Sequence, residues 1–358
     1  MSPQNFKTYR ESLSDQERQK LDSILKLELS VQSDIIDQNI KRDREHLRLV
    51  NFCADPFRYM GNLHKETEYL FIRVEPLYSL AIKNFDSAIF NQSQKVLMLV
   101  ECKSSVSDAD GEVESVNQAI LEASSHKKEL EDTVGDTINM IENVICTNAA
   151  YSSRIKSAIL KRNLPICLWS ADQASSMLLL EKQGEDTSTE VSRGRLHHDS
   201  KLTRLLLEGI KSGGPVRSVS FLPSSHPCTI LEEVLPMLNV ELEKTAATHF
   251  GLSDVSKLLN NESSPLLYNF SDRELWRFAE YIVGVAQEAG IFRDLKSASS
   301  DLETKQFELG VKKATVKSMT EDVRKKYVDY HAARKAEEKA LERFEKDRSK
   351  QVRKLDDF

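Results

Sequence analysis

The segment KVLMLVECK, residues 95–103, decides the fold class of this 358-residue chain. Five consecutive apolar residues between polar ends are typical of a β-strand that is buried on both faces of a sheet. Residues 143–147 and 164–169 repeat this pattern, and residues 149–162 between them have helical periodicity. Strands that alternate with helices predict an α/β protein whose sheet is covered by helices.

A β-hairpin is expected immediately before and within this segment. Residues 85–90 form a short β-prone run, and the polar residues 91–94 predict the connecting turn. With that loop, Phe90 pairs with Lys95. A register shifted by two residues is the alternative.

Charged side chains are expected where the hairpin ends. Because side chains alternate along a strand, Glu101 and Lys103 point to one face and Cys102 to the other. In the first register Asp86 lies opposite Leu99 and diagonal to Glu101. In the shifted register Asp86 lies directly opposite Glu101.

Two carboxylates on one face repel each other unless a cation lies between them, and Mg²⁺ is the oxygen-seeking cation expected there. Lys103 adds a positive charge that can position a water molecule and stabilise negative charge on a phosphate. Phosphodiester hydrolysis needs these parts. The alternative interpretation is an ordinary exposed Glu–Lys pair at a strand end.

These residues resemble a known signature. Asp86, the apolar strand and Glu101-Cys102-Lys103 are similar to the active-site motif of the PD-(D/E)XK nuclease superfamily, which includes restriction endonucleases. The resemblance covers residues 55–171 and implies a restriction-endonuclease-like mixed sheet flanked by helices. It also implies that Asp86 and Glu101 hold Mg²⁺, for which Mn²⁺ can substitute, and that Lys103 positions the attacking water.

The resemblance suggests one further acid and includes two departures. Family members often carry an additional metal-binding acid on the first helix, for which Glu68 is our match and Glu75 the competitor. Phe85 replaces the proline of the nominal signature. Gln118 begins a Gln-x-x-x-Tyr motif found in some members, but Glu122 stands in place of its tyrosine, so that subgroup is not indicated.

Other copies of the Glu-x-Lys pattern show how much context matters. Residues 303–305 and 337–339 match it as well, but both lie in the charged tail. The copy at residues 101–103 differs because it follows a buried strand and a second strand that bears an acid.

Helical patterns dominate outside this region. The capping box Ser14-Asp-Gln-Glu17 begins a helix that should run to about residue 52 and break before Pro56. A further helical stretch is predicted over residues 59–77. From Thr229 onward the pattern is entirely helical, with a second capping box at residues 271–274.

The composition limits the class of protein. Apolar residues make up 40% of the chain and charged residues 30%, the mean hydropathy is −0.44, and there are only 12 Gly and 9 Pro. This favours long helices over a loop-rich β-sandwich. Because no apolar stretch is long enough to span a membrane and residues 1–22 are too polar for a secretory signal, we expect a cytoplasmic protein with no membrane partner.

Cysteine spacing and charge add two expectations. The five cysteines show no C-x-x-C spacing, which predicts reduced thiols and argues against a structural zinc site or a disulfide framework. The net charge of −6 argues weakly against generic nucleic-acid binding. Residues 296–358 nevertheless carry 17 basic and 13 acidic residues, so a local basic surface is compatible with the composition.

Two weaker candidates concern nucleic-acid binding. Residues 247–256 resemble a helix-turn-helix with a shortened turn, and the alternative is a plain helical corner. The polar stretch 185–200 is predicted to be a loop, and basic residues in and after it are candidates for phosphate contacts or a solvated surface: Arg193, Arg195, His197, His198, Lys201 and Arg204. No phosphate-binding loop or dinucleotide fingerprint is present in the sequence, so no nucleotide cofactor is expected.

The predicted architecture is an α/β nuclease domain with an N-terminal helical arm and a mostly helical C-terminal region. The predicted segments are a helical arm (residues 1–54), a nuclease domain (55–175), a polar connection (176–227), a helical domain (228–295) and a long charged amphipathic helix (296–358).

The predicted function is Mg²⁺-dependent hydrolysis of double-stranded DNA by a restriction-type endonuclease. Asp86, Glu101, Lys103 and Glu68 form the site, and the resemblance implies a homodimer. The alternatives are a DNA-repair or RNA-processing nuclease with the same site, and a non-catalytic scaffold protein with the same fold.

Overall fold

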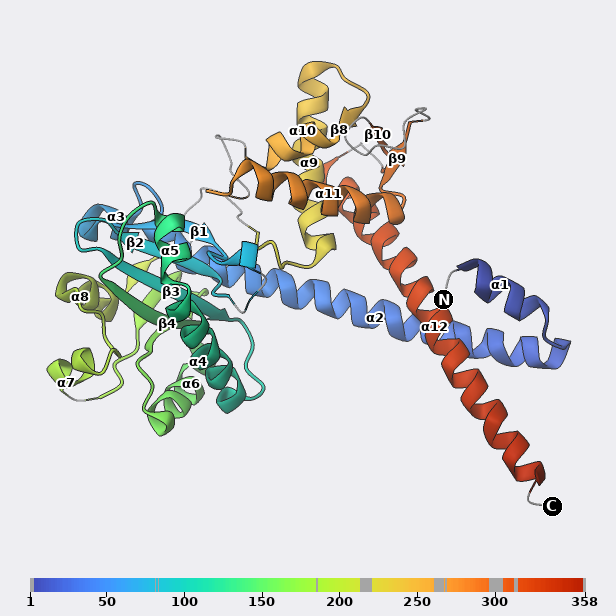
Figure 1. Ribbon diagram of the computed structural model, residues 1–358, viewed down its shortest axis with the longest axis horizontal. Helices are drawn as coiled ribbons and strands as arrows, with labels where there is room; N and C mark the ends of the chain where they lie inside the picture. Colours follow the sequence, from blue (N-terminus) through green and yellow to red (C-terminus); the bar gives the residue numbers. More distant parts are fainter. Residues whose placement is uncertain are drawn as a thin grey trace. The chain divides into compact units, whose positions relative to one another are not determined.

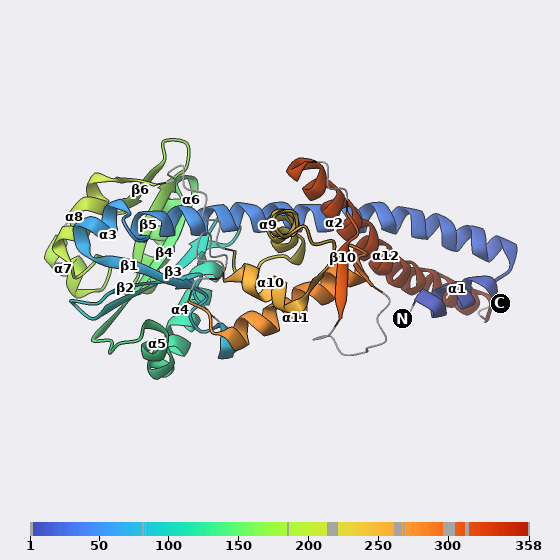
Figure 2. The ribbon, with the colours of Figure 1, turned by 90° about the horizontal axis from the view of Figure 1, so that it is seen from above.

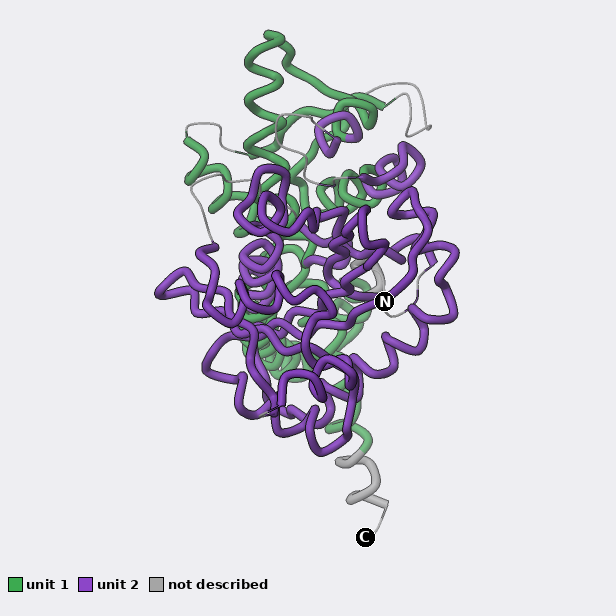
Figure 3. The backbone as a smooth tube through the Cα atoms, turned by 90° about the vertical axis from the view of Figure 1, so that its left-hand side faces the viewer, with its two compact units in different colours: residues 1–41, 226–255, 279–358 green, residues 42–225, 256–278 purple. Residues whose placement is uncertain are grey.

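The computed structural model divides the chain into two compact units (Figure 3). It describes residues 3–80, 82, 84–184, 186–212, 221–260, 267, 269–295, 305–311 and 315–356. Unit 1 comprises Met1–Lys41, His226–Val255 and Ala279–Phe358, and unit 2 comprises Arg42–Ser225 and Ser256–Phe278. Both units combine distant segments, unlike the five consecutive segments predicted from the sequence. None of the described helices has a stretch long and apolar enough to cross a membrane.

Helices make up most of the described chain. They are α1 (Pro3–Glu11), α2 (Asp15–Ala54), α3 (Asn62–Thr67), α4 (Ala109–Ser125), α5 (Lys127–Val134), α6 (Ala149–Arg162), α7 (Thr187–Ser192), α8 (Ser200–Glu208), α9 (Pro227–Thr245), α10 (Leu252–Leu259), α11 (Asp272–Glu288) and α12 (Val316–Asp356), with the 3-10 turns η1 (Asp55–Phe57) and η2 (Tyr78–Leu80).

The strands form two sheets. Seven strands lie in unit 2: β1 (Tyr69–Val74), β2 (Ser87–Asn91), β3 (Val96–Lys103), β4 (Met140–Asn148), β5 (Cys167–Asp172), β6 (Met177–Leu180) and β7 (Ile210–Lys211). Three short strands lie in unit 1: β8 (Phe250–Gly251), β9 (Phe292–Asp294) and β10 (Gln306–Leu309).

The sheet of unit 2 is mixed and runs in the order β1-β2-β3-β4-β5-β6-β7. Strand β3 pairs with β4, and β4 with β5, in parallel, whereas the other neighbours are antiparallel. Helix α6 connects β4 to β5, as the alternating pattern predicted. The α/β class is therefore confirmed.

Each face of this sheet packs against helices (Figures 1 and 2). On one face, α4, α5 and α6 bury a continuous apolar core against side chains such as Leu97 and Leu99 of β3. The end of α2 and the turn η1 cover the other face, where Phe57 stacks on Trp169 with ring centroids 5.5 Å apart. Because β3 is covered on both faces, its run of apolar residues is fully buried, as predicted.

The two predicted capping boxes are confirmed. Ser14 and Glu17 hydrogen-bond reciprocally at the start of α2, which runs to Ala54. Ser271 and Glu274 do the same at the start of α11. These local contacts satisfy backbone N–H groups that the first turn of a helix leaves without partners.

The helix predicted over residues 59–77 is wrong. The helical part is limited to α3, and the following residues form β1, which pairs antiparallel with β2 from Tyr69–Asn91 to Val74–Ser87. Glu68 ends α3 in the left-handed conformation, with a φ of 62°. The aromatic and β-branched residues of β1 gain more from pairing with the sheet than a short helix would provide.

The prediction that everything after Thr229 is helical is also wrong, because β8, β9 and β10 form a small sheet in the order β8-β10-β9. The predicted long charged helix is present as α12. It packs against α9, and its Leu341 and Phe344 join an apolar cluster with Phe6 and Leu21 near the N-terminus. Its apolar stripe is thus used within unit 1.

Candidate active site

The hairpin of β2 and β3 places the predicted acids opposite each other. The register pairs Ser87 with Val100 and Asn91 with Val96, so its continuation by one residue sets Asp86 against Glu101. The first predicted register was therefore wrong by two residues, and the stated alternative is correct. The strand extends one residue further than expected because the Asn91 side chain itself caps the turn, accepting a hydrogen bond from the Gln94 N–H at 2.9 Å.

Asp86 is held from two directions at the start of β2. One carboxylate oxygen accepts a hydrogen bond from the backbone N–H of Cys102 at 2.6 Å. The other lies 3.0 Å from Nε2 of His46, which comes from α2. Asp86 is 8% exposed, so this buried carboxylate has a fixed orientation at the end of the hairpin.

Lys103 lies between two acids. Its ammonium group is 2.8 Å from Glu101 on the same strand and 2.9 Å from Glu112 on α4. The side chains of Lys103 and Glu101 are 16% and 15% exposed, so solvent screens their charges less than it would at the surface. The predicted exposed Glu–Lys pair is therefore not what the structure shows.

Glu75 approaches the same cluster from the end of β1. Its backbone N–H donates to the carbonyl oxygen of Asp86 at 3.2 Å, and its carboxylate accepts hydrogen bonds from the side chain and backbone N–H of Ser224. Burial, reinforced by the nearby charge of Asp86, raises the pKa of Glu75 to about 7 against the opposing hydrogen bonds from Ser224.

Glu68 does not join the cluster, contrary to the prediction. It precedes Tyr69, which pairs with Asn91 at the far end of β2, whereas Asp86 lies at the other end of that strand. Its carboxylate instead accepts a hydrogen bond from Ser93 in the hairpin loop at 2.6 Å. The error follows from treating β1 as a helix, which would have turned Glu68 toward the hairpin end.

Three further groups in the cluster have raised pKa values. Burial and the neighbouring charge of Asp86 raise the pKa of Glu101 to about 7, although Lys103 and His46 act in the opposite direction. Burial opposes a charge on His46, but Asp86 and Glu101 outweigh it and raise the pKa of His46 to about 9. Against burial, the charge of Glu101 also raises the pKa of Lys103.

The carboxylates of this cluster are of the type that holds a hard divalent cation, but no three His, Cys, Asp or Glu ligand atoms of the cluster lie within 4.8 Å of one another among the described residues, so the acids would have to move closer together to bind an ion. Asp86, Glu101 and Glu75 offer carboxylate oxygens, the ligand type that Mg²⁺ and Mn²⁺ prefer. Burial and the repulsion from Asp86 outweigh the attraction of Lys103 and His46 and keep the pKa of Glu101 raised. An added cation would relieve this repulsion and favour the ionised form of Glu101.

Two members of the cluster were missed by sequence reasoning. His46, on α2, lies 40 residues before Asp86, whereas Glu112, on α4, follows Lys103 by nine residues. No local spacing marks either residue. An acid at the start of the helix after the strand, close to Lys103, was the available signal for Glu112.

The predicted basic cluster is mostly used in structural ion pairs. Arg193 and Arg195 lie 3.4 and 3.5 Å from Glu190, and Lys201 lies 3.1 Å from Glu66. Residues 187–192 form α7, so the predicted continuous loop is wrong.

His197, from the same basic cluster, is fully buried. Its Nδ1 lies 2.6 Å from Glu142, and the indole N–H of Trp169 donates to its Nε2. A cavity of about 400 Å³ lies next to it, lined in part by His198, Ser200 and Arg204. Glu142 pairs with Met98 in the first half of β3, away from the end that carries Glu101 and Lys103.

The helix-turn-helix-like segment has a strand at its turn. Residues Phe250 and Gly251 form β8, and α10 follows directly. Phe250, Leu252 and Val255 are buried, so these side chains serve the core. On α11, Arg273 and Arg277 are exposed and spaced one helical turn apart.

Comparisons of the chain with protein-family models, with curated proteins and with solved structures found no significant match. The functional argument therefore rests on the geometry of the residues described above.

Proposed function

We propose that the chain is a nuclease that uses a divalent cation, Mg²⁺ or Mn²⁺, to hydrolyse phosphodiester bonds in double-stranded DNA, in the manner of a restriction-type endonuclease. The observation that carries the proposal is the placement of Asp86 opposite Glu101, with Lys103 paired to Glu101 at 2.8 Å. The three residues keep the order and spacing of the PD-(D/E)XK motif.

The bound cation would polarise a phosphoryl oxygen and favour ionisation of the attacking water. Asp86 and Glu101 would hold it, and Glu75, whose backbone N–H donates to the Asp86 carbonyl oxygen, is the third candidate acid. Glu75 replaces Glu68 in this role, because Glu68 lies at the other end of β2.

The chain's own residues then orient and stabilise the reacting groups. Lys103 carries a positive charge that would stabilise the negative charge on the phosphate as the water attacks, and would hold that water in line. Glu112 accepts from the same ammonium group and so fixes its direction. Protonated His46 keeps one Asp86 oxygen in place while Cys102 N–H holds the other.

Helix α11 is a candidate for contact with the DNA backbone. Arg273 and Arg277 are exposed on one side of this helix, and Tyr281 follows at the same spacing. Arginines on one helix face can bind phosphates or guanine edges. This candidate replaces the segment 247–256, whose apolar side chains are buried.

Plasmid cleavage tests the proposal. The wild type should cut plasmid DNA with Mg²⁺ and not with EDTA, and Lys103→Ala should lower the rate at least about 100-fold. Lys339→Ala is the matched control, because Lys339 belongs to another Glu-x-Lys copy and lies exposed on α12. Both variants should retain the wild-type circular dichroism spectrum.

The cleavage products separate the alternatives. Discrete fragments support a sequence-specific restriction enzyme, and cleavage confined to damaged, branched or RNA substrates supports a repair or RNA-processing nuclease. Absence of cleavage of all these substrates with both metals would leave a non-catalytic scaffold. If a homodimer cuts both strands, sedimentation of the protein should give twice the mass of one chain.

A further inference from the structure

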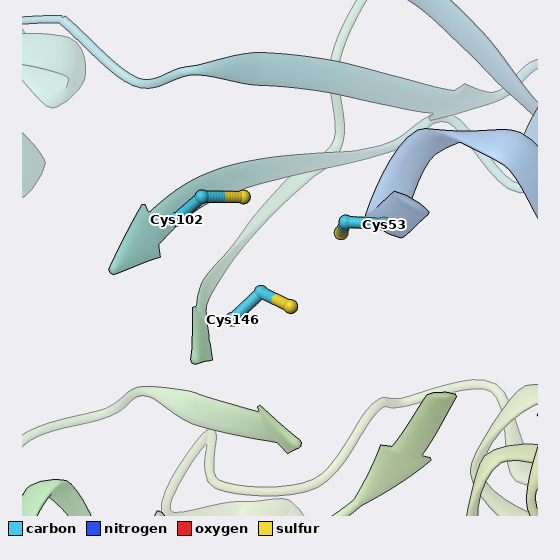
Figure 4. Close-up of side chains that lie close together, drawn as sticks. All are labelled: Cys53, Cys102 and Cys146. Atoms are coloured by element: carbon cyan, nitrogen blue, oxygen red, sulfur yellow. The ribbon is translucent and has the colours of Figure 1, made fainter. Parts of the chain in front are cut away.

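Three cysteines meet on the face of β3 opposite to Glu101 and Lys103. Cys53 comes from the last turn of α2, Cys102 from β3 and Cys146 from β4, where it is the register partner of Cys102. Figure 4 shows the three side chains projecting into one space. Their sulfur atoms all lie within 4.8 Å of one another, and the residues are 0%, 1% and 0% exposed.

We propose that Cys53, Cys102 and Cys146 form a binding site for one thiophilic metal ion, of the class that includes Zn²⁺ and Cu⁺. Thiolates select such soft ions over Mg²⁺. With metal–sulfur bonds of about 2.3 Å, ligand sulfur atoms lie roughly 3.8–4.0 Å apart. The sulfur atoms therefore need to move together by less than about 1 Å to bind the ion.

The surroundings of the cluster favour a cation. The carbonyl groups at the end of the 40-residue helix α2 place a partial negative charge near Cys53. Burial raises the pKa of Cys53 and Cys102, whereas hydrogen bonds from these two thiols lower the pKa of Cys146 to about 5. Binding of an ion would therefore displace the protons of Cys53 and Cys102. A disulfide would join two of the three cysteines and would not account for the third.

The other two cysteines provide an internal comparison. Cys167 and Cys228 are also buried, but the groups near their sulfur atoms are His197 and Glu232, respectively. Ordinary burial of a small apolar side chain explains each of them. It does not explain why three cysteines from three elements point their sulfur atoms into one space.

The coordination number points to the kind of ion. Among the described residues, no fourth His, Cys, Asp or Glu ligand atom belongs to this group. Structural zinc sites take four protein ligands, whereas three sulfur ligands suit a three-coordinate ion such as Cu⁺. Zn²⁺ would need a small molecule or water as its fourth ligand.

The ion would connect three elements of unit 2. It would tie the end of α2 to the adjacent strands β3 and β4, and so stabilise the sheet against unfolding. The site does not depend on nuclease activity, so its test and the cleavage test can fail independently.

Metal binding by the full chain is the test. Reduced, metal-free protein is titrated anaerobically with Zn²⁺, Cu⁺ or Cd²⁺, and bound metal is counted by elemental analysis after desalting. We expect one ion per chain, a sulfur-to-cadmium charge-transfer band, and a rise in Tm of at least about 5 °C. Preference for Zn²⁺ or Cu⁺ identifies the ion without affecting the proposal.

Matched variants assign the site. Cys53→Ser and Cys146→Ser should each lower stoichiometric binding at least about tenfold, because each removes one thiolate. Cys228→Ser, a buried cysteine of unit 1, should bind like the wild type. The proposal would be overturned if the wild type bound none of the three ions, and this result does not depend on whether the variants fold. An equal loss of metal binding in Cys228→Ser would also overturn it.

Discussion

The two faces of the end of β3 carry two chemically opposite clusters. On one face, Glu101 and Lys103 belong to a group of oxygen and nitrogen atoms that are partly exposed and charged. On the other face, Cys102 belongs to a group of three fully buried sulfur atoms. The alternation of side chains along one strand separates a candidate hard-metal site from a candidate soft-metal site.

The comparison shows what each cluster depends on. The acids are adjacent because one hairpin brings Asp86 opposite Glu101, which is a local pairing. The sulfur atoms meet because α2 packs on the sheet and β4 runs parallel to β3, which are long-range arrangements. Helix α2 contributes to both clusters through His46 and Cys53, which are two turns apart.

The largest effect on cleavage is expected from a change on the face of β3 that carries the acids. Glu101→Gln should lower Mg²⁺-dependent cleavage at least about 100-fold, because it removes a carboxylate from the proposed cation site. It should leave the binding of thiophilic metal unchanged. Cleavage rates and metal content measured on the same preparations provide the check.

Cys146→Ala is the matched change on the sulfur side, since Cys146 is the strand partner of Cys102. It should abolish binding of the thiophilic ion and lower stability, while cleavage falls by less than about tenfold at a temperature where the variant stays folded. Equal loss of cleavage in Glu101→Gln and Cys146→Ala would show that the two clusters are not separate.

These contrasts also explain how far the sequence could be interpreted. The apolar run of β3, the hairpin and helix α6 were predictable because local periodicity specifies them, and α6 spans residues 149–162 as expected. The opposition of Asp86 and Glu101 was predictable only as one of two registers, since the turn geometry chooses between them.

Contacts between distant segments could not be predicted from the sequence. His46 reaches Asp86 from a helix in the N-terminal region, and Cys53 reaches Cys102 from the same helix. Cysteine spacing argued against a metal site because it detects ligands from one turn or hairpin, and these three come from separate elements. The β1 strand was missed because its pairing with β2 outweighs a weak helical pattern.

A smaller effect is expected at the α2 residue that contacts the acids. His46→Ala should lower cleavage about 10- to 100-fold by leaving one oxygen of Asp86 without its partner, as is typical of residues that orient metal ligands. Because the pKa of His46 is raised to about 9, the wild type should lose activity as the pH rises through that value.

Two variants separate positioning by His46 from a structural role. His46→Gln retains an N–H donor, so it should recover part of the activity and remove the decline near pH 9. Cys53→Ala, on the same helix, should keep that decline. An unchanged pH profile in His46→Gln would contradict the assignment of His46 as a positioning residue.

The pH dependence of stability gives a further test of the acid cluster. Glu101 has its pKa raised from 4.5 to about 7, so the folded state binds the proton more tightly than the unfolded state. Without a divalent cation, the free energy of unfolding should therefore decrease as the pH rises from about 4.5 to 7, by at most about 3 kcal/mol for this group. Glu75 contributes in the same direction.

Urea unfolding at several pH values in EDTA measures this decrease. Glu101→Gln should reduce the slope, and Mg²⁺ should restore stability near pH 7 in the wild type but not in this variant. Lys339→Ala, at an exposed position on α12, should keep the wild-type slope. A slope that is unaltered in Glu101→Gln would show that the proton is taken up elsewhere.

The smallest effect is expected for Glu68, which the sequence resemblance placed at the site and the structure places at the other end of β2. Glu68→Gln should change cleavage by no more than about twofold, since Glu68 lies in the exposed loop region at the far end of β2 and contacts Ser93. Glu75→Gln should lower cleavage more, by roughly tenfold, because Glu75 lies against Asp86 at the site. Cleavage rates of the two variants at saturating Mg²⁺ compare the acids directly. A larger loss in Glu68→Gln than in Glu75→Gln would mean that the active enzyme brings Glu68 to the hairpin end, and that β1 must rearrange when DNA binds.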